Sequence, residues 1–278
     1  MTLAESLKAY RIQLALILPL LALAYWTIVP YMVQQWNNDA NYSHGFIVPV
    51  ISGYFIYERR RELLDAESAP SNWGLLLILA GVLQLCIGYV AFELYTMRSS
   101  LVVVLAGLTL FLLGTRVFRI MLLPLLYLFF MVPLPYIVYD SVAFPLKQFV
   151  AKYSVAVLQL MGVVIIREGN VLMLPETTLE VADACSGIRS LVSLLALAVA
   201  FAAMTQKSTL KRCIMVFSAI PIAILTNALR VIVTGILAQY WGSKAAEGFF
   251  HEFAGLAVFG VALVLLAGLG SLLRKVGR

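Results

Sequence analysis

The sequence predicts an all-α polytopic membrane protein, and three observations support this fold class. Hydrophobic residues make up 62% of the 278 residues and charged residues only 12%, far from the usual balance of a soluble domain. Apolar segments of helical length recur from Ile12 to Leu273 with no long polar stretch between them, which favours one membrane domain over residues 1–278. The basic residues stand mostly at the ends of these segments, so the net charge of +6 indicates membrane topology rather than a nucleic-acid partner.

Eight apolar segments approach the length that a helix needs to cross a hydrocarbon core of about 30 Å. We therefore predict about eight transmembrane helices, near residues 12–29, 43–57, 73–92, 99–113, 118–134, 187–204, 213–230 and 251–273. The first segment has a basic flank, but no small-residue cleavage site follows it, so we interpret it as a helix and not as a signal peptide.

Cationic clusters between these segments predict the orientation of the chain. The clusters are Lys8 and Arg11; Arg59, Arg60 and Arg61; Arg116 and Arg119; Lys207, Lys211 and Arg212; and Arg274, Lys275 and Arg278. All five lie on one side if the chain crosses the bilayer between them as predicted. By the positive-inside rule this side is the cytoplasm, so both termini are expected to be cytoplasmic.

The region between the fifth and sixth predicted spans has both of its ends outside, so it crosses the bilayer an even number of times or not at all. Residues 136–164 are apolar, but they contain Asp140, Pro145, Lys147 and Lys152. This pattern favours an amphipathic helix lying at the outer interface, and two extra crossings at 136–166 are the alternative.

A small extracytoplasmic hairpin is predicted to follow this helix. Glu168, Gly169 and Asn170 form a turn signal, and a Pro-Glu pair separates two further short runs of apolar and β-branched residues. The hairpin delivers the chain to Cys185.

The predicted topology collects polar side chains at the outer ends of the helices. They are Asp39, Tyr42, Ser43, His44, Asp183, Cys185, Ser186, Arg189, Asn227, Arg230, His251 and Glu252. Polar and ionisable groups at the edge of an apolar layer are energetically expensive, so each of them is a candidate for function.

Cys185 is the candidate nucleophile, because the stretch ADACSGIRS places it with Ser186 and Gly187 at the start of a predicted helix. The positive end of a helix dipole lowers the pKa of a thiol, and free N–H groups there can hold an oxyanion. A small core residue is the alternative. We interpret Cys86 and Cys213 as structural residues. Three scattered cysteines provide no disulfide framework.

Arg230 and His251 supply the other components of cysteine acyl transfer, a cation and a proton carrier. Arg230 ends the seventh predicted helix beside Asn227. Because cations are disfavoured on the outer side, Arg230 is expected to have an anionic partner or a functional role. The alternative is a side chain that snorkels to the headgroups. His251 opens the last span, where an N-cap or an interfacial filler is the alternative. His44 is a rival base.

Arg189 and the two histidines leave further alternatives open. Arg189 is either a second anion clamp or a structural partner of Asp183 or Glu180. Zinc bound by Cys185, His44, His251 and an acid is conceivable, but the spacings match no compact ligand motif. We therefore predict a site without a metal or another cofactor.

Several motifs resemble those of the exosortase and archaeosortase family of membrane transpeptidases. ACSGIRS at 184–190, NALR at 227–230 and HEFAG at 251–255 each enter or leave a predicted membrane helix, in this order. NYSHG at 41–45 and EGN at 168–170 resemble accessory motifs of the family. The archaeal branch has arginine where this chain has His251, so the bacterial branch fits better.

The resemblance implies a cysteine endopeptidase and transpeptidase, a thiol protease with Cys185 as nucleophile, Arg230 as the positive group and His251 as acid or base. It implies substrates that are exported proteins with a Pro-Glu-Pro-like motif, one transmembrane helix and a basic tail at their C-terminus. Such proteins are cut at the periplasmic face of the bacterial inner membrane and are expected to pass to a glycan or lipid acceptor of the cell surface.

Two other classes of function compete with this interpretation. A transporter or flippase-like component of exopolysaccharide export predicts polar residues spread through the depth of several helices. A non-catalytic scaffold of an export complex predicts that Cys185 tolerates alanine.

Overall fold

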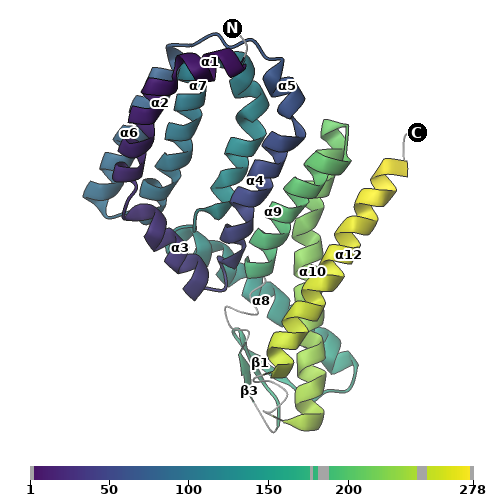
Figure 1. Ribbon diagram of the computed structural model, residues 1–278. Coiled ribbons are helices and arrows are strands. Elements are labelled where there is room, and N and C mark those ends of the chain that lie inside the picture. The colour runs from purple at the N-terminus through teal and green to yellow at the C-terminus, as the bar shows by residue number, and fades with distance from the viewer. Residues whose placement is uncertain (1–2, 176–177, 181–187, 243–248, 276–278) are drawn as a thin grey trace. The chain divides into compact units, whose positions relative to one another are not determined.

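The computed structural model describes residues 3–175, 178–180, 188–242 and 249–275. The chain forms two compact units, Met1–Pro135 (unit 1) and Tyr136–Arg278 (unit 2), and helices dominate both (Figure 1). Within the described part of the chain, four helices are long and apolar enough to cross a membrane, or five if one bent pair counts as a single span. An all-α polytopic membrane fold is therefore confirmed, whereas the eight crossings and the single domain stay predictions.

The N-terminal helices of unit 1 differ from the predicted single helix at 12–29. After α1 (Leu3–Ala9), the chain forms α2 (Arg11–Ala24) and α3 (Ile28–Asn38), and these two helices are bent by 56° against each other. Pro30 stands in the first turn of α3. Because proline has no N–H and its ring clashes with the preceding turn, the helix restarts just before it.

The remaining helices of unit 1 follow the predicted segments with shifted ends. They are η1 (Ser43–Phe46), α4 (Ile47–Glu58), α5 (Arg60–Leu64), α6 (Trp73–Ala91), α7 (Leu94–Tyr127) and η2 (Leu128–Met131). The predicted spans 99–113 and 118–134 meet inside α7, where Gly114 has φ 85° and ψ −178° and breaks the helical geometry. A Cβ on Gly114 would overlap the carbonyl of Ala69, so only glycine fits this break.

One end of unit 1 gathers its basic residues. Helices α1 and α5 both contact α7, and Leu63 of α5 packs against Val117 beyond the break at Gly114. Arg116 forms an exposed ion pair of 4.0 Å with Glu67. Lys8, Arg59, Arg60, Arg61 and Arg116 therefore define the basic end of unit 1.

Unit 2 begins with a long helix and a small sheet. The helix predicted for the outer interface is α8 (Tyr136–Leu160), and its position in a membrane stays a prediction. The segment of the predicted small hairpin forms a three-stranded antiparallel sheet of β1 (Ile166–Glu168), β2 (Val171–Met173) and β3 (Thr178–Glu180). Leu172 is the central register position, opposite Arg167 on one side and Leu179 on the other.

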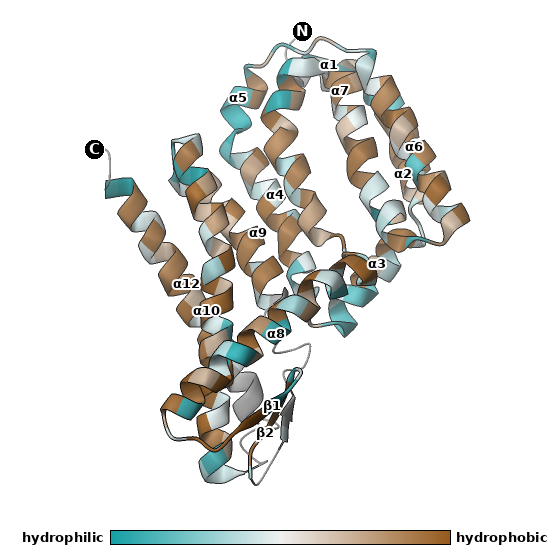
Figure 2. Cartoon of the chain, turned by 180° about the vertical axis from the view of Figure 1, so that it is seen from behind, coloured by the Kyte–Doolittle hydropathy of each residue, from teal (hydrophilic) through white to brown (hydrophobic). Residues whose placement is uncertain are grey.

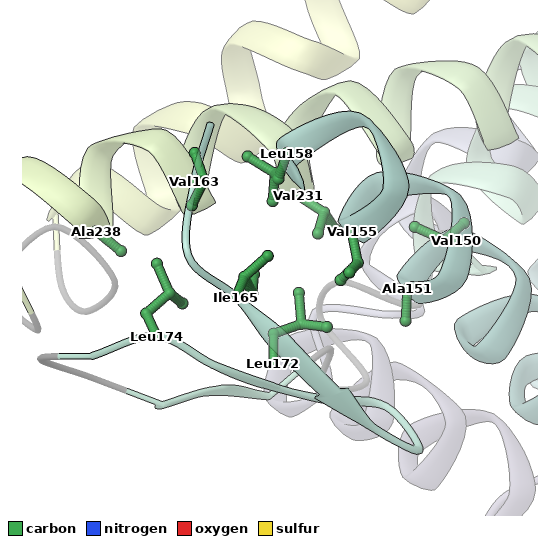
Figure 3. Packing of buried hydrophobic residues seen from close by; sticks show 10 residues of the cluster. All are labelled: Val150, Ala151, Val155, Leu158, Val163, Ile165, Leu172, Leu174, Val231 and Ala238. Atoms are coloured by element: carbon green, nitrogen blue, oxygen red, sulfur yellow. The ribbon is translucent and has the colours of Figure 1, made fainter. Parts of the chain in front are cut away.

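The sheet region packs against α8 and against α10 (Thr209–Trp241) through one apolar cluster (Figure 3). Leu158 of α8 and Leu172 of β2 are fully buried in this cluster, together with Val231 of α10. Gly235 of α10 leaves the room that Leu158 occupies, since a Cβ there would lie 2.8 Å from a methyl group of Leu158. The cluster fixes α10 against the elements that precede Cys185 in the chain.

Three helices of unit 2 pack together, namely α9 (Ile188–Thr205), α10 and α12 (Phe249–Lys275). Hydrophobic residues cover their lengths, and the end of α12 next to the C-terminus is hydrophilic (Figure 2). Lys207 and Lys211 line a pocket there together with Arg274 and Lys275. These four residues define the basic end of unit 2.

Candidate functional site

Arg230 lies inside α10 and not at its end. The predicted helix stopped at residue 230, but α10 continues for 11 residues to Trp241, so this predicted end is wrong. Arg230 is only 8% exposed, and its neighbours Thr226 and Asn227 are each 4% exposed. Among the described residues of unit 2, Arg230 is the only buried side chain that carries a charge.

The guanidinium of Arg230 packs against Gly255 of α12. A Cβ placed on Gly255 would lie 3.2 Å from Nη2 and 3.3 Å from Cζ of Arg230, which is closer than nearly all real contacts of a Cβ. The guanidinium therefore takes the space that a side chain at position 255 would need. Glycine at this position lets the cation touch the backbone of α12.

This contact lies on the face of α12 that carries His251. Gly255 follows His251 by four residues, and positions i and i+4 of a helix share one face. Only the backbone is described for His251, the third residue of α12, and for Arg189, the second residue of α9. The packing of α10 against α12 thus brings Arg230 within one helical turn of the position of the predicted base.

The contact lies at about the same distance from the basic end of unit 2 along both helices. Arg230 is 21 residues from Thr209, and Gly255 is 20 residues from Lys275. At 1.5 Å per residue, the contact lies about 30 Å from the basic end of unit 2 along either helix. This is about the thickness of a hydrocarbon core. The position of Arg230 in a membrane stays a prediction, and α10 extends 11 residues beyond it.

The candidate nucleophile precedes α9 in the chain. Asp183, Cys185 and Ser186 lie outside the described residues. Helix α9 begins at Ile188, three residues after Cys185, and packs against both α10 and α12. In the described part of the chain, Cys86 and Cys213 are free and exposed.

His44 lies in unit 1 and is held by backbone carbonyls. It stands in the 3-10 turn η1 ahead of α4, outside the candidate membrane-spanning helices. Its Nε2 donates a hydrogen bond of 3.1 Å to the carbonyl of Phe130. Burial lowers the pKa of His44, and backbone hydrogen bonds to Phe130 and Asn41 oppose this shift in part. A ring engaged in this way suits a structural role better than proton transfer.

The NYSHG segment and Trp36 close this end of unit 1 against η2 and the residues after it. Trp36 Nε1 donates to the carbonyl of Met131 at 2.9 Å, and the Tyr42 hydroxyl donates to the carbonyl of Leu134 at 3.4 Å. Gly45 lies against the Trp36 ring, because a Cβ there would approach the ring to 2.5 Å. The motif therefore has a structural explanation within unit 1.

Arg98 is a buried cation that the sequence-based reasoning missed. It is 2% exposed, and its Nη1 donates a hydrogen bond of 2.7 Å to Gln35 Oε1. Its guanidinium also lies 5.5 Å from the centre of the Tyr31 ring. The signal was present, because an arginine opposite the other basic residues of unit 1 conflicts with the positive-inside rule.

Glu93 shapes the surroundings of Arg98. It stands in the turn between α6 and α7 and caps α7, since its carboxylate accepts from the N–H groups of Tyr95 and Thr96 at 3.1 and 2.6 Å. Burial raises the pKa of Glu93, but hydrogen bonds from Thr96 and Tyr95 and the charge of Arg98 lower it more, so the net shift is downward. The two charges compensate each other at the start of α7.

Metal ligands do not gather among the side chains that the structure describes, since no three His, Cys, Asp or Glu residues come together there. Cys185 falls outside those residues, so the zinc alternative is not tested. The prediction of a site without a cofactor stays a prediction.

The fold and these residues define a class, a polytopic α-helical membrane protein that buries a cation beside the helix of a predicted catalytic histidine. The family described as transmembrane exosortase (Exosortase_EpsH) matches residues 36–268, which reach from α3 well into α12. The chain therefore belongs to the transmembrane exosortase family. No curated protein and no solved structure matches the chain.

Proposed function

We propose that this chain is a membrane-embedded cysteine endopeptidase and transpeptidase that cleaves C-terminal Pro-Glu-Pro-type sorting signals of exported proteins. It acts at the periplasmic face of the bacterial inner membrane and transfers the cleaved protein to a cell-surface acceptor. Membership of the exosortase family supports this proposal. The observation that carries it is the contact of Arg230 with Gly255, one helical turn after His251.

The proposal includes eight crossings, with α8 at the outer interface and the basic ends of both units in the cytoplasm. The gathering of cations at one end of each unit supports this orientation under the positive-inside rule. The distance of about 30 Å between the basic end of unit 2 and Arg230 supports a site at the outer boundary of the bilayer.

The proposed mechanism is acyl transfer through a thioester. His251 takes the proton of the Cys185 thiol, and the thiolate attacks the scissile carbonyl. Arg230 and the N–H groups at the start of α9 stabilise the oxyanion of the tetrahedral intermediate. The C–N bond breaks, and the leaving amine takes the proton from His251. An amine, a hydroxyl or water then attacks the thioester and releases the Cys185 thiolate.

The substrate fits this site through its own topology. A substrate helix with a basic tail in the cytoplasm places its motif at the outer boundary, level with Arg230. Its acidic residue then meets the cations Arg189, Arg230 or Arg167. Arg167 is exposed in β1 and donates to Gln148 Oε1 and to the carbonyl of Gly169. Asp183, Ser186 and Asn227 are proposed to support these contacts.

Substitution of the cysteines tests the nucleophile. Cys185→Ala is expected to abolish processing of a co-expressed, epitope-tagged protein that carries the sorting signal. Cys86→Ala and Cys213→Ala are matched controls and are expected to leave processing unchanged, because both thiols are exposed and free. Intact processing by Cys185→Ala would refute the proposal.

Comparison of the two histidines tests the base. His251→Ala is expected to stop processing. His44→Ala is expected to leave the turnover rate of the folded fraction unchanged, because the His44 ring binds backbone carbonyls. Loss of processing in well-folded His44→Ala alone would reverse this assignment.

A further inference from the structure

A pocket lies at the end of α9, α10 and α12 that is opposite to the contact between Arg230 and Gly255. There the ends of α9, α10 and α12 surround a pocket of about 950 Å³. Its polar lining includes Lys207, Ser208, Lys211, Ser271, Arg274 and Lys275. The catalytic proposal uses none of these groups.

The charge of this pocket selects an anion. Four of its lining residues are cations, and the sequence contains no Asp or Glu in residues 188–246 and 253–278. Among the described residues that line the pocket, four are cations and none is a carboxylate. A basic peptide, including the tail of a proposed substrate, is repelled from such a site.

The pocket also offers hydrogen-bond donors suited to phosphate. Ser208 is the N-cap of α10 but makes no capping hydrogen bond with its side chain, so its hydroxyl is available to a ligand. The first N–H groups of α10 and the positive end of its dipole face the same region. Lysine and arginine charges beside these donors form the usual surroundings of a bound phosphate.

The wall of the pocket is fixed by contacts between its helices. Gln206 is buried, and its Nε2 donates a hydrogen bond of 2.9 Å to the carbonyl of Gly270 in α12. The Arg212 Nε donates to the carbonyl of Gln206 at 2.8 Å, which holds the turn between α9 and α10 in place. The cations therefore surround a preformed hollow.

The apolar surroundings of the pocket indicate a lipid as the source of the phosphate. Leu210 and Leu272, which are sequence neighbours of pocket residues, are both largely exposed. The pocket also lies about 30 Å along the helices from Arg230, the thickness of a hydrocarbon core. We infer that the pocket binds the phosphate headgroup of an anionic phospholipid, which joins the ends of α9, α10 and α12 while its acyl chains lie along their apolar surfaces.

Native mass spectrometry of the full chain in detergent, titrated with phosphatidylglycerol or phosphatidylcholine, tests this inference. The wild type is expected to retain phosphatidylglycerol and to melt at a higher temperature in its presence. The variant Lys207→Gln/Arg274→Gln/Lys275→Gln changes three exposed cations. It is expected to bind phosphatidylglycerol about 100-fold more weakly, at roughly fivefold per cation.

A charge-matched variant provides the control. Lys8→Gln/Arg11→Gln/Arg61→Gln removes three exposed cations from unit 1 and is expected to keep the binding and the stabilisation. Equal loss in both variants, or equal retention of phosphatidylcholine, would show a non-specific charge effect and overturn the inference. Displacement of the lipid by excess inorganic phosphate would identify a site for a soluble anion and overturn it as well. If the triple variant does not fold, the three single variants decide by the same comparison.

Discussion

Arg98 in unit 1 and Arg230 in unit 2 are both buried cations in long apolar helices, but their surroundings differ. Arg98 binds the Gln35 side chain, lies against the Tyr31 ring and has Glu93 nearby. Arg230 touches the backbone of α12 at Gly255, one turn from His251. Burial of a charge alone therefore does not indicate catalysis. The residues around the charge distinguish a cation with a structural role from a candidate catalytic cation.

The largest expected effect concerns Arg230. Arg230→Gln is expected to lower the rate of substrate processing by about 10²–10³-fold, because a donor to the oxyanion is lost. The measurement is single-turnover cleavage by purified protein, normalised to its folded fraction. A folded Arg230→Gln protein with wild-type rates would remove the distinction between the two arginines.

Arg98 is expected to affect stability and not catalysis. Arg98→Met leaves the half-buried Gln35 amide without its donor and is expected to cost about 1–3 kcal/mol of unfolding free energy. Arg116→Met breaks only an exposed ion pair and is expected to cost less than about 1 kcal/mol. Thermal unfolding in detergent measures both. Equal destabilisation by the two variants would contradict the structural role of Arg98.

Gly255 provides a finer test of the contact in unit 2. Gly255→Ala is expected to lower the processing rate about tenfold, because the new methyl group displaces the guanidinium by a few tenths of an ångström. Gly260→Ala is the matched control in the same helix, since a Cβ there meets nothing within 4 Å. The same loss in both variants would mean that the close packing of Arg230 has no functional consequence.

The smallest expected effect is a dependence of stability on pH that arises from His44. Burial lowers the pKa of His44 below its ordinary 6.5, so the unfolded chain binds a proton more readily than the folded chain. The contribution of His44 to stability is therefore complete above pH 6.5 and declines as the pH falls below it. Melting temperatures measured from neutral pH to about pH 5 are expected to fall less steeply in His44→Gln. An unchanged slope in this variant would contradict the prediction.

The predicted helix ends were accurate where local sequence signals bound the helix and inaccurate where they do not. The segment 73–92 matches α6 (Trp73–Ala91), because an uninterrupted apolar run between turns leaves no alternative. The predicted end at 230 fell short, because it was placed at a single arginine, whereas the residues after it, VIVTGILAQYW, are again mostly apolar and continue the helix to Trp241. The segment 12–29 failed because Pro30 forces a restart whose bend angle depends on packing.

The sequence also identified some polar residues of the protein and missed others. Residue types and motif order singled out Cys185, Arg230 and His251, since a thiol, a cation and an imidazole are chemically recognisable in a chain with so few polar groups. Arg98 escaped notice at the boundary of a predicted span. Its partner Gln35 is 63 residues away, and no local pattern connects the two.

The amino-acid sequence by itself determined the class of protein, the apolar helices, the basic ends and the exosortase family, because hydropathy, charge and motifs are properties of single segments. Only the tertiary structure decided that Arg230 lies against Gly255 and that four cations surround one pocket. It also decided that His44 binds a carbonyl. These facts depend on which helix faces meet, and that is set by packing between segments far apart in the chain.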